Sequence, residues 1–320
     1  MNAAELKNRV GSILKQANCA YLYMILKGED GFELRLADMN DNEETEGAVK
    51  RLFVDRITSD IVENEELQVL GVTDDERNAD AVFKYDLNKH PDELDLFFGF
   101  DTKTLVSDRT KFDFEKDSLD KLYGFIAEIG NHESSIILFK KHYPIMLLRR
   151  ELLLGMFKSK KRFETLPDTE ILRIGGGFQM LRVDEEVFVT DRKMLDQIKN
   201  DNVFLEERLT ESIKVIKALD AVEDPESLMD DGNAAITRRL CGISANSPVI
   251  NRGISAERLV EYTKTTEELK VRFHYSDDGK RIRLDTKASK MAFLKLLNDA
   301  FLRSELTEHY YEANAKVKLE

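Results

Sequence analysis

The chain has 320 residues, of which 42% are hydrophobic and 34% are charged, and its formal net charge is -13. This composition excludes a disordered chain and predicts a globular protein large enough for two domains. No stretch reaches the roughly 18 consecutive apolar residues that span a bilayer, and the N-terminus lacks the apolar core of a signal peptide, so we expect a cytoplasmic protein. The two cysteines, Cys19 and Cys241, cannot form a disulfide framework or a cysteine zinc site, and we expect both to be buried thiols.

The first 130 residues predict an acidic unit of mixed helices and strands. Two strand-like runs, 19–27 and 31–37, are joined by a Gly-Glu-Asp-Gly turn and predict a hairpin. Apolar residues recur at helical spacing between 44 and 62, which predicts a helix. The other expected elements of this unit are strands at 67–72 and 81–87, a helical turn at 92–98 that follows Pro91, and a helix at 118–129 with Ser118 as its N-cap.

Residues 134–318 predict a second unit that begins with strands and continues with helices. The expected strands are 135–139, 145–148, 171–174, 178–183 and 187–190, and the expected helices are 204–221, 228–241 and 255–269. A hairpin of 270–275 and 281–285 around an Asp-Asp-Gly turn then precedes a closing helix. We therefore expect an α+β protein of two units, 1–130 and 134–318, with mixed or antiparallel sheets and packed helices.

The closing segment is amphipathic from Met291 to Leu302. Its apolar residues recur at helical spacing, which predicts one buried helix face, so we expect the C-terminal segment to close a core. The residue order Leu-Leu-Asn-Asp-x-x-Leu-x-Ser-x-Leu-Thr at 296–307, followed by Tyr311 and Lys316, resembles the closing signature of the KwaB family of the Kiwa anti-phage defence system. In outline, the strands and the long helix of 135–318 are similar to that family as well.

The resemblance implies a defence effector that binds duplex DNA without strong sequence preference and works with a small, multi-span, KwaA-like membrane protein. It also implies a cytoplasmic location, with recruitment to the inner face of the membrane by that partner as an option. We further expect the chain to form a homo-oligomer, with a dimer as the favoured state. The family supplies no motif that assigns the DNA contact to particular residues.

The charge alternates in sign along the chain. Residues 1–130 contain 16 Lys and Arg against 29 Asp and Glu, whereas 134–162 contain eight basic residues against a single acidic one, Glu151. Residues 163–232 are acidic again, with eight basic against eighteen acidic residues, and 233–303 are basic, with fourteen against eight. This alternation separates two basic segments from two acidic ones.

The basic segments are the candidate DNA-binding surface, because affinity for a duplex comes largely from neutralised phosphates and released counterions. The alternative is that these residues form a solvated surface or dock onto the acidic front of the same chain. The twelve candidates are Lys140, Lys141, Arg149, Arg150, Lys158, Lys160, Lys161, Arg162, Arg238, Arg239, Arg281 and Arg283.

Catalytic chemistry is the competing class of function. A metal-dependent nuclease or phosphodiesterase often carries an acidic-x-Lys triplet on a strand, and Glu268 to Lys270 and Asp278 to Lys280 have that spacing. The five histidines are solitary, and the glycines at 175–177 lack the Lys-Ser/Thr of a phosphate loop, so we expect a turn there. We therefore expect no catalytic residue, metal or cofactor, with the nuclease as second choice and a structural adaptor docked on a membrane protein as third.

Overall fold

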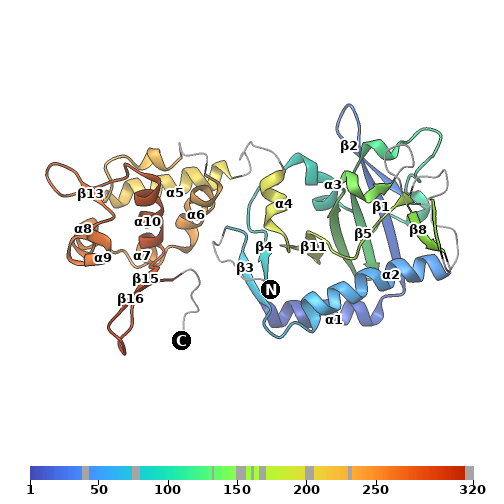
Figure 1. Ribbon diagram of the computed structural model, residues 1–320, viewed down its shortest axis with the longest axis horizontal. Coiled ribbons are helices and arrows are strands. Elements are labelled where there is room, and N and C mark those ends of the chain that lie inside the picture. The colour runs from blue at the N-terminus through green and yellow to red at the C-terminus, as the bar shows by residue number, and fades with distance from the viewer. Residues whose placement is uncertain are drawn as a thin grey trace. The chain divides into compact units, whose positions relative to one another are not determined.

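The computed structural model describes residues 1–37, 43–73, 80–131, 133–148, 156–159, 162–165, 171–198, 205–229 and 233–313. These residues form two compact units (Figure 1). Unit 1 comprises Met1–Val69, Val82–Tyr85 and Asp92–Ile198, and unit 2 comprises Leu70–Ala81, Asp86–Pro91 and Lys199–Glu320. Both helices and strands are present, so the expected α+β class is confirmed.

Unit 1 is built on an eight-stranded sheet with the order β2-β1-β5-β6-β11-β12-β4-β3. Neighbouring strands from β2 to β4 in this order pair antiparallel. The strands are β1 (Cys19–Lys27), β2 (Phe32–Leu36), β3 (Gln68–Gly71), β4 (Ala81–Lys84), β5 (Leu122–Gly130), β6 (Ser135–Lys141), β11 (Met180–Val183) and β12 (Glu186–Val189).

Two helices cover one face of this sheet (Figure 1). They are α1 (Ala3–Gln16), which begins with a capping box of Asn2 and Glu5, and α2 (Glu43–Ile57), which continues into a π-helical turn (Thr58–Val62). Their apolar faces, represented by Val10 and Phe53, pack against alternate residues of the central strands. Because side chains alternate across a strand, the intervening residues of β1, β5, β6 and β11 lie on the other face.

Short elements complete unit 1. A 3-10 turn (Asp92–Leu94) leads into α3 (Asp95–Phe98), and the buried side chain of Phe97 contacts Phe139 of β6 with ring centroids 5.8 Å apart. Single-turn 3-10 segments occur at Val106–Asp108, Leu119–Lys121 and Pro144–Met146. The remaining elements are α4 (Arg192–Gln197) and two small sheets, one of β7 (Leu147–Leu148) with β10 (Ile171–Leu172) and one of β8 (Met156–Ser159) with β9 (Arg162–Thr165).

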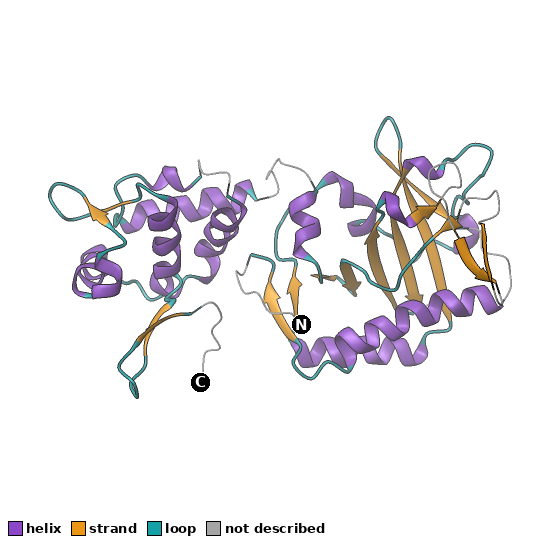
Figure 2. Ribbon diagram, viewed as in Figure 1, coloured by secondary structure: helices purple, strands orange, loops and turns teal. Residues whose placement is uncertain are grey.

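The described part of unit 2 is mainly helical (Figure 2). Its core gathers apolar residues of α5, α6, α8 and α10, including Ile216, Leu240 and Phe293, which are each 0% exposed. The helices are α5 (Glu206–Leu219), a 3-10 turn (Pro225–Leu228), α6 (Ala234–Asn246), α7 (Pro248–Asn251), α8 (Ala256–Thr265), α9 (Glu267–Lys270) and α10 (Lys287–Leu297). The strands are β13 (His274–Tyr275), β14 (Ile282–Arg283), β15 (Phe301–Arg303) and β16 (Tyr310–Glu312).

The C-terminal segment closes the core only in part. Helix α10 buries seven of its residues, as its apolar spacing predicts, and begins with a capping box of Thr286 and Ser289. The helix ends before Asp299, whose φ of 55° turns the chain into the β15–β16 hairpin. The closing helix is therefore shorter than the amphipathic pattern at 291–302 predicts, and a hairpin follows it. In that hairpin, Leu306 is 94% exposed.

The segment expected as a helix at 118–129 is the central strand β5, so that prediction was wrong. Ser118 caps only a 3-10 turn, where its side chain accepts a hydrogen bond from the amide of Asp120. Strand β5 pairs with β1 and β6 and is buried on both faces, which produces a continuous apolar run without a clear period of two. Because β6 pairs with β5 in the same sheet, Gly130 and Ser135 both lie in unit 1, and the last change of unit along the chain falls after Ile198.

Candidate nucleic-acid interface

The twelve basic residues predicted to contact DNA belong to both units. Lys140 and Lys141 end β6, Lys158 lies on β8 and Arg162 on β9, while Arg238 and Arg239 lie on α6. Arg281 precedes β14 and Arg283 ends it. Arg149, Arg150, Lys160 and Lys161 lie outside the described residues.

The β8–β9 hairpin, in which β8 and β9 pair antiparallel, carries Lys158 near the end of β8 and Arg162 at the start of β9. Its backbone register pairs Lys158 with Phe163 and Ser159 with Arg162. The sequence between the two strands is Lys160-Lys161, so four of five consecutive residues here are basic. A high local density of positive charge is what a surface that neutralises adjacent phosphates requires.

The two lysines of β6 are partly enclosed by their own unit. The Nζ atom of Lys140 donates to the carbonyl oxygen of Gly177 at 2.5 Å, and Nζ of Lys141 lies 5.6 Å from the ring centroid of Tyr123. Burial lowers the pKa of both lysines. Gly177 belongs to the expected glycine turn, which leads into strand β11 and not into the helix that a phosphate loop needs. Lys140 therefore holds a turn of unit 1 in place.

Glycine is required within this turn. A Cβ atom at Gly176 would lie 2.5 Å from the carbonyl oxygen of Leu52 on α2, which is far inside van der Waals contact. The absence of a side chain lets the turn pack directly against the backbone of the helix. Packing against α2 thus explains the middle glycine of the run, whereas a Cβ atom at Gly175 or Gly177 would meet no atom within 4 Å.

Arg239 of α6 is a buried residue. Its side chain is 8% exposed, and burial lowers the pKa of its guanidinium group. A duplex cannot reach a residue of this exposure without a rearrangement of unit 2. Its neighbour Arg238 is of intermediate exposure.

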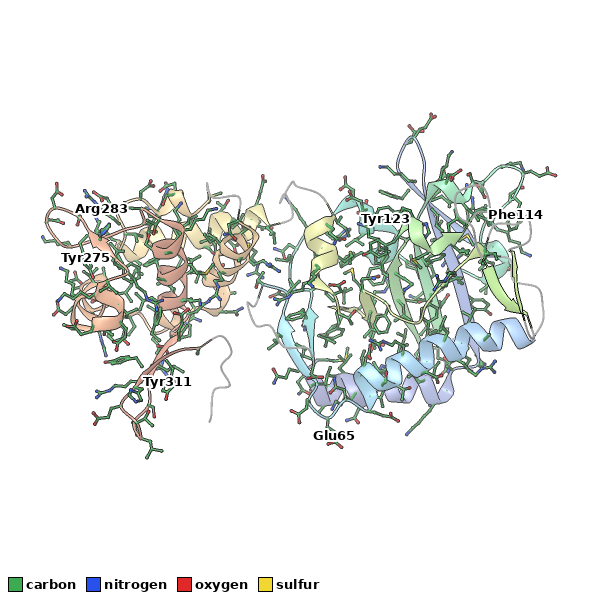
Figure 3. All side chains as sticks on the ribbon, viewed as in Figure 1. Glu65, Phe114, Tyr123, Tyr275, Arg283 and Tyr311 are labelled. Carbon is green, nitrogen blue, oxygen red and sulfur yellow. The ribbon has the colours of Figure 1, made fainter. Side chains whose placement is uncertain are left out.

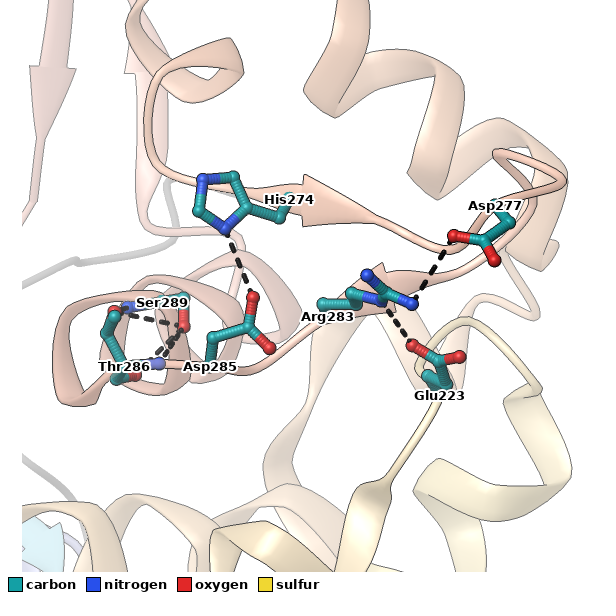
Figure 4. Close-up of polar contacts among 7 residues, drawn as sticks. All are labelled: Glu223, His274, Asp277, Arg283, Asp285, Thr286 and Ser289. Atoms are coloured by element: carbon teal, nitrogen blue, oxygen red, sulfur yellow. Dashed lines mark hydrogen bonds and ion pairs between the residues drawn. The ribbon is translucent and has the colours of Figure 1, made fainter.

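Arg281 and Arg283 are exposed, and carboxylates of the same unit contact both. The Nε and Nη2 atoms of Arg281 donate to the two carboxylate oxygens of Asp220 at 2.9 and 3.1 Å. Arg283 donates from Nε to Glu223 at 2.7 Å, and its Nη2 lies 3.5 Å from Asp277 (Figure 4). These contacts raise the pKa of each guanidinium group, through Asp220 for Arg281 and through Glu223 for Arg283.

A polar cluster that sequence reasoning missed lies on the sheet face of unit 1 opposite α1 and α2. The hydroxyl of Tyr23 donates to the carboxylate of Glu128 at 3.2 Å, and burial raises the pKa of Glu128. Arg182 of β11 donates from Nη1 to the carbonyl oxygens of Phe97 and Phe98 at 3.2 and 2.6 Å and from Nη2 to that of Phe100. Both charged residues interrupt otherwise apolar strands, which is the sequence signal that could have indicated the cluster.

The residues proposed for nuclease chemistry do not have the expected geometry. Glu268 and Lys270 lie on helix α9, whereas the acidic-x-Lys triplet of such enzymes lies on a strand. Asp278 occupies the turn between β13 and β14, where its carboxylate accepts hydrogen bonds from Ser276 and from the amide of Lys280. Within the described ranges, no group of three or more His, Cys, Asp or Glu side chains could hold a metal ion.

None of the helices in the described part of the chain is both long enough and apolar enough to cross a bilayer. Large apolar side chains are exposed at several of the described positions. Examples are Phe114 in unit 1, 79% exposed, and Tyr311 in unit 2, 51% exposed (Figure 3).

Comparison with known proteins identifies a protein family and a similar protein from a bacterium. The family described as "Kiwa protein KwaB-like" matches residues 119–307, which is more than half of the chain. Kiwa protein KwaB from Escherichia coli O55:H7 (strain RM12579 / EPEC) is 24% identical over 282 residues, which cover 84% of this chain and 85% of the relative. No solved structure gave a match.

Proposed function

Because the chain belongs to the KwaB-like family of Kiwa proteins, we propose that it is a component of a Kiwa anti-phage defence system that binds duplex DNA without strong sequence preference. The membership confirms the family expected from the closing signature at 296–316. The proposal that the protein binds DNA goes beyond family membership, and the position of the basic residues supports it.

The β8–β9 hairpin is the observation that carries this step. The backbone register brings Ser159 opposite Arg162, where β8 ends and β9 begins, and four of the five residues from Lys158 to Arg162 are basic. Contacts to phosphate groups carry no base information, and such a surface binds all duplexes with similar affinity. By contrast, Lys140 and Arg239 are engaged within their own units, and Arg281 and Arg283 contact carboxylates.

Salt-dependent binding tests this proposal. Replacing Lys158, Lys160, Lys161 and Arg162 by Ala should weaken the binding of unrelated duplexes alike. It should flatten the slope of log K against log salt by a few units, since each neutralised phosphate contributes about 0.9. The matched control replaces four exposed lysines of the acidic front, Lys15, Lys27, Lys103 and Lys121, by Ala, which removes the same charge.

The two variants separate local contact from net charge. Equal losses in both would mean that overall charge governs binding, and the hairpin would not be the interface. Unchanged affinity together with a lower melting temperature in the hairpin variant would show that these residues pair with the chain's own acidic groups.

We propose further that the protein acts on DNA by binding and not by cleavage. Linear and supercoiled DNA should then remain intact after incubation with the protein and Mg²⁺ or Mn²⁺. Cleavage that disappears in the Glu268→Ala variant would contradict this and would favour the nuclease alternative.

The proposed partners are duplex DNA, a small membrane protein with several spans, and a second copy of the chain. A neighbouring gene should encode such a membrane protein, and its co-expression with a tagged chain should yield a complex in mild detergent. Light scattering of the purified chain should give the mass of a dimer. Recovery of monomer without the membrane protein would contradict this assembly and leave the DNA contact as a separate question.

A further inference from the structure

Arg281 and Arg283 present two guanidinium groups on the same side of β14. Between them, Ile282 is 0% exposed and packs into the core of unit 2. Because side chains alternate along an extended strand, the residues on either side of Ile282 point away from that core. The arginine side chains are accordingly 46% and 39% exposed.

The backbone fixes the position of the carboxylates that contact these arginines. The segment that follows α5 runs beside β14, where the amide of Ile282 donates to Ala221 and the amide of Glu223 donates to Ile282, at 2.9 and 3.0 Å. Val222 forms a parallel bridge with Ile282. Asp220 ends α5 with a φ of 58°. Asp220 and Glu223 are thus held beside Arg281 and Arg283 by main-chain hydrogen bonds.

The carboxylates mark where the oxygens of another anion would fit. Arg281 binds Asp220 through Nε and Nη2. A guanidinium group makes the same bidentate contact with phosphate. Arg283 donates to Glu223 and faces Asp277, whose side chain is 99% exposed (Figure 4). Ion pairs as exposed as these stabilise a fold only slightly, so an external anion can compete for the same donors.

We propose that Arg281 and Arg283 form a second phosphate-binding site, which Asp220 and Glu223 occupy until a polyphosphate or nucleic-acid backbone displaces them. The site takes phosphate oxyanions as a class, because the guanidinium groups contact only the charged oxygens. As a contact with DNA, it rests on the proposed function; as an anion site, it stands on the geometry of unit 2. Because an external anion must displace these carboxylates, a ligand of low charge density binds only weakly.

The test compares anion binding by the full-length chain and its Asp220→Asn, Glu223→Gln double variant. Asn is well tolerated at a positive φ, so the end of α5 keeps its conformation, and Gln has the shape of Glu. Inorganic tripolyphosphate, measured by calorimetry at low salt, should bind the double variant several-fold more tightly than the parent chain. Duplex binding should gain about one to two in the slope of log K against log salt, one phosphate for each released arginine.

A matched control removes the same kind of ion pair elsewhere. Arg9 donates from Nε and Nη2 to Asp184 at 2.8 and 2.6 Å in unit 1, so Asp184→Asn also frees an arginine held by two hydrogen bonds. This variant should leave tripolyphosphate binding unchanged. Adding Arg281→Ala and Arg283→Ala to the double variant should abolish the gain.

Each outcome decides the inference. Unchanged tripolyphosphate affinity in the double variant, an equal gain in Asp184→Asn, or a gain that survives removal of both arginines would overturn it. The single variants Asp220→Asn and Glu223→Gln, with melting temperatures near that of the parent, decide the matter where the double variant unfolds. Failure of the parent chain to bind duplex DNA would reject the proposed function, whereas the tripolyphosphate result tests the site itself.

Discussion

The hydroxyl group of Tyr23 on β1 donates a hydrogen bond to the carboxylate of Glu128 on β5, at 3.2 Å. This contact lies on the sheet face that α1 and α2 do not cover. Burial raises the pKa of Glu128, and hydrogen bonds from Tyr23 and Ser135 together with the charges of Arg109 and Arg182 oppose the increase without cancelling it. The folded protein therefore favours the protonated form of Glu128 more than the unfolded chain does.

Glu128→Gln should make the protein more stable at neutral pH. A group whose pKa is raised on folding contributes its full stability below its unfolded pKa, here 4.5, and that contribution is lost as the pH rises through the folded pKa. Gln resembles the protonated form and does not titrate. The melting temperature of the variant should therefore exceed that of the parent at pH 7, and the difference should disappear as the pH falls towards 4.5.

The exposed Glu65 supplies the control for this prediction (Figure 3). Glu65→Gln should leave the melting temperature at pH 7 nearly unchanged, because substitutions of exposed side chains away from the core usually change stability little. If the Glu128→Gln variant melts at a lower temperature than the parent at pH 7, the attraction between the Glu128 carboxylate and Arg109 and Arg182 outweighs the cost of burying its charge.

Arg182→Ala should destabilise unit 1 strongly. Arg182 donates to the carbonyl oxygens of three residues in the segment 97–100, and its removal leaves these acceptors beside an apolar core without their donor. Hydrogen bonds from a charged group contribute about 1.5 to 3 kcal/mol each, so we expect a loss of roughly 3 kcal/mol in the free energy of unfolding after partial relaxation. Denaturant titration followed by tyrosine fluorescence measures it.

Arg56 is the matched arginine for this experiment. It pairs with Asp60 at 2.7 Å on the exposed surface of α2 and the adjoining turn. Such a pair contributes at most about 1 kcal/mol, so Arg56→Ala should cost far less than Arg182→Ala. Equal losses in the two variants would show that the backbone contacts of Arg182 do not anchor the segment 97–100.

Strand β5 shows where sequence reasoning about this fold fails. The expected strand at 19–27 coincides with β1, because its turn residues and β-rich composition are local signals. Residues 122–130 are buried on both faces in the middle of the sheet, so the polar positions that would reveal alternation are absent. The two units expected from the sequence, 1–130 and 134–318, meet between β5 and β6, which pair in one sheet. The pairing of β5 with β1 and β6 identifies it as a strand.

The sequence shows where basic residues are concentrated, but it does not show which of their side chains are exposed. Charge counting finds the run from Lys158 to Arg162, because these basic residues follow one another in the sequence. It cannot distinguish Arg239, which is 8% exposed, from Arg281, which a carboxylate sixty-one positions earlier contacts. Burial and long-range pairing depend on tertiary structure, and a local pattern of charges does not contain them.

Phe293→Ala should cost unit 2 about 3 to 5 kcal/mol of unfolding free energy, the usual loss for a large aromatic side chain removed from a core. Phe293 on α10 is 0% exposed and belongs to the core of unit 2. Leu306→Ala, in the hairpin that follows and 94% exposed, should change stability by less than about 0.5 kcal/mol. A larger loss for Leu306→Ala would show that the hairpin packs against a second molecule in solution.

Cys241 should be inert toward thiol reagents in the folded protein. Its side chain is 1% exposed on α6, and burial raises the pKa of the thiol to about 12, so the reactive thiolate is nearly absent at neutral pH. In a Cys19→Ser variant, which retains Cys241 as its single cysteine, a colorimetric disulfide reagent should react very slowly at pH 7.5 and completely in denaturant. The native reaction rate then measures the opening of unit 2 around α6. Rapid stoichiometric reaction under native conditions would show that this helix is not packed as described.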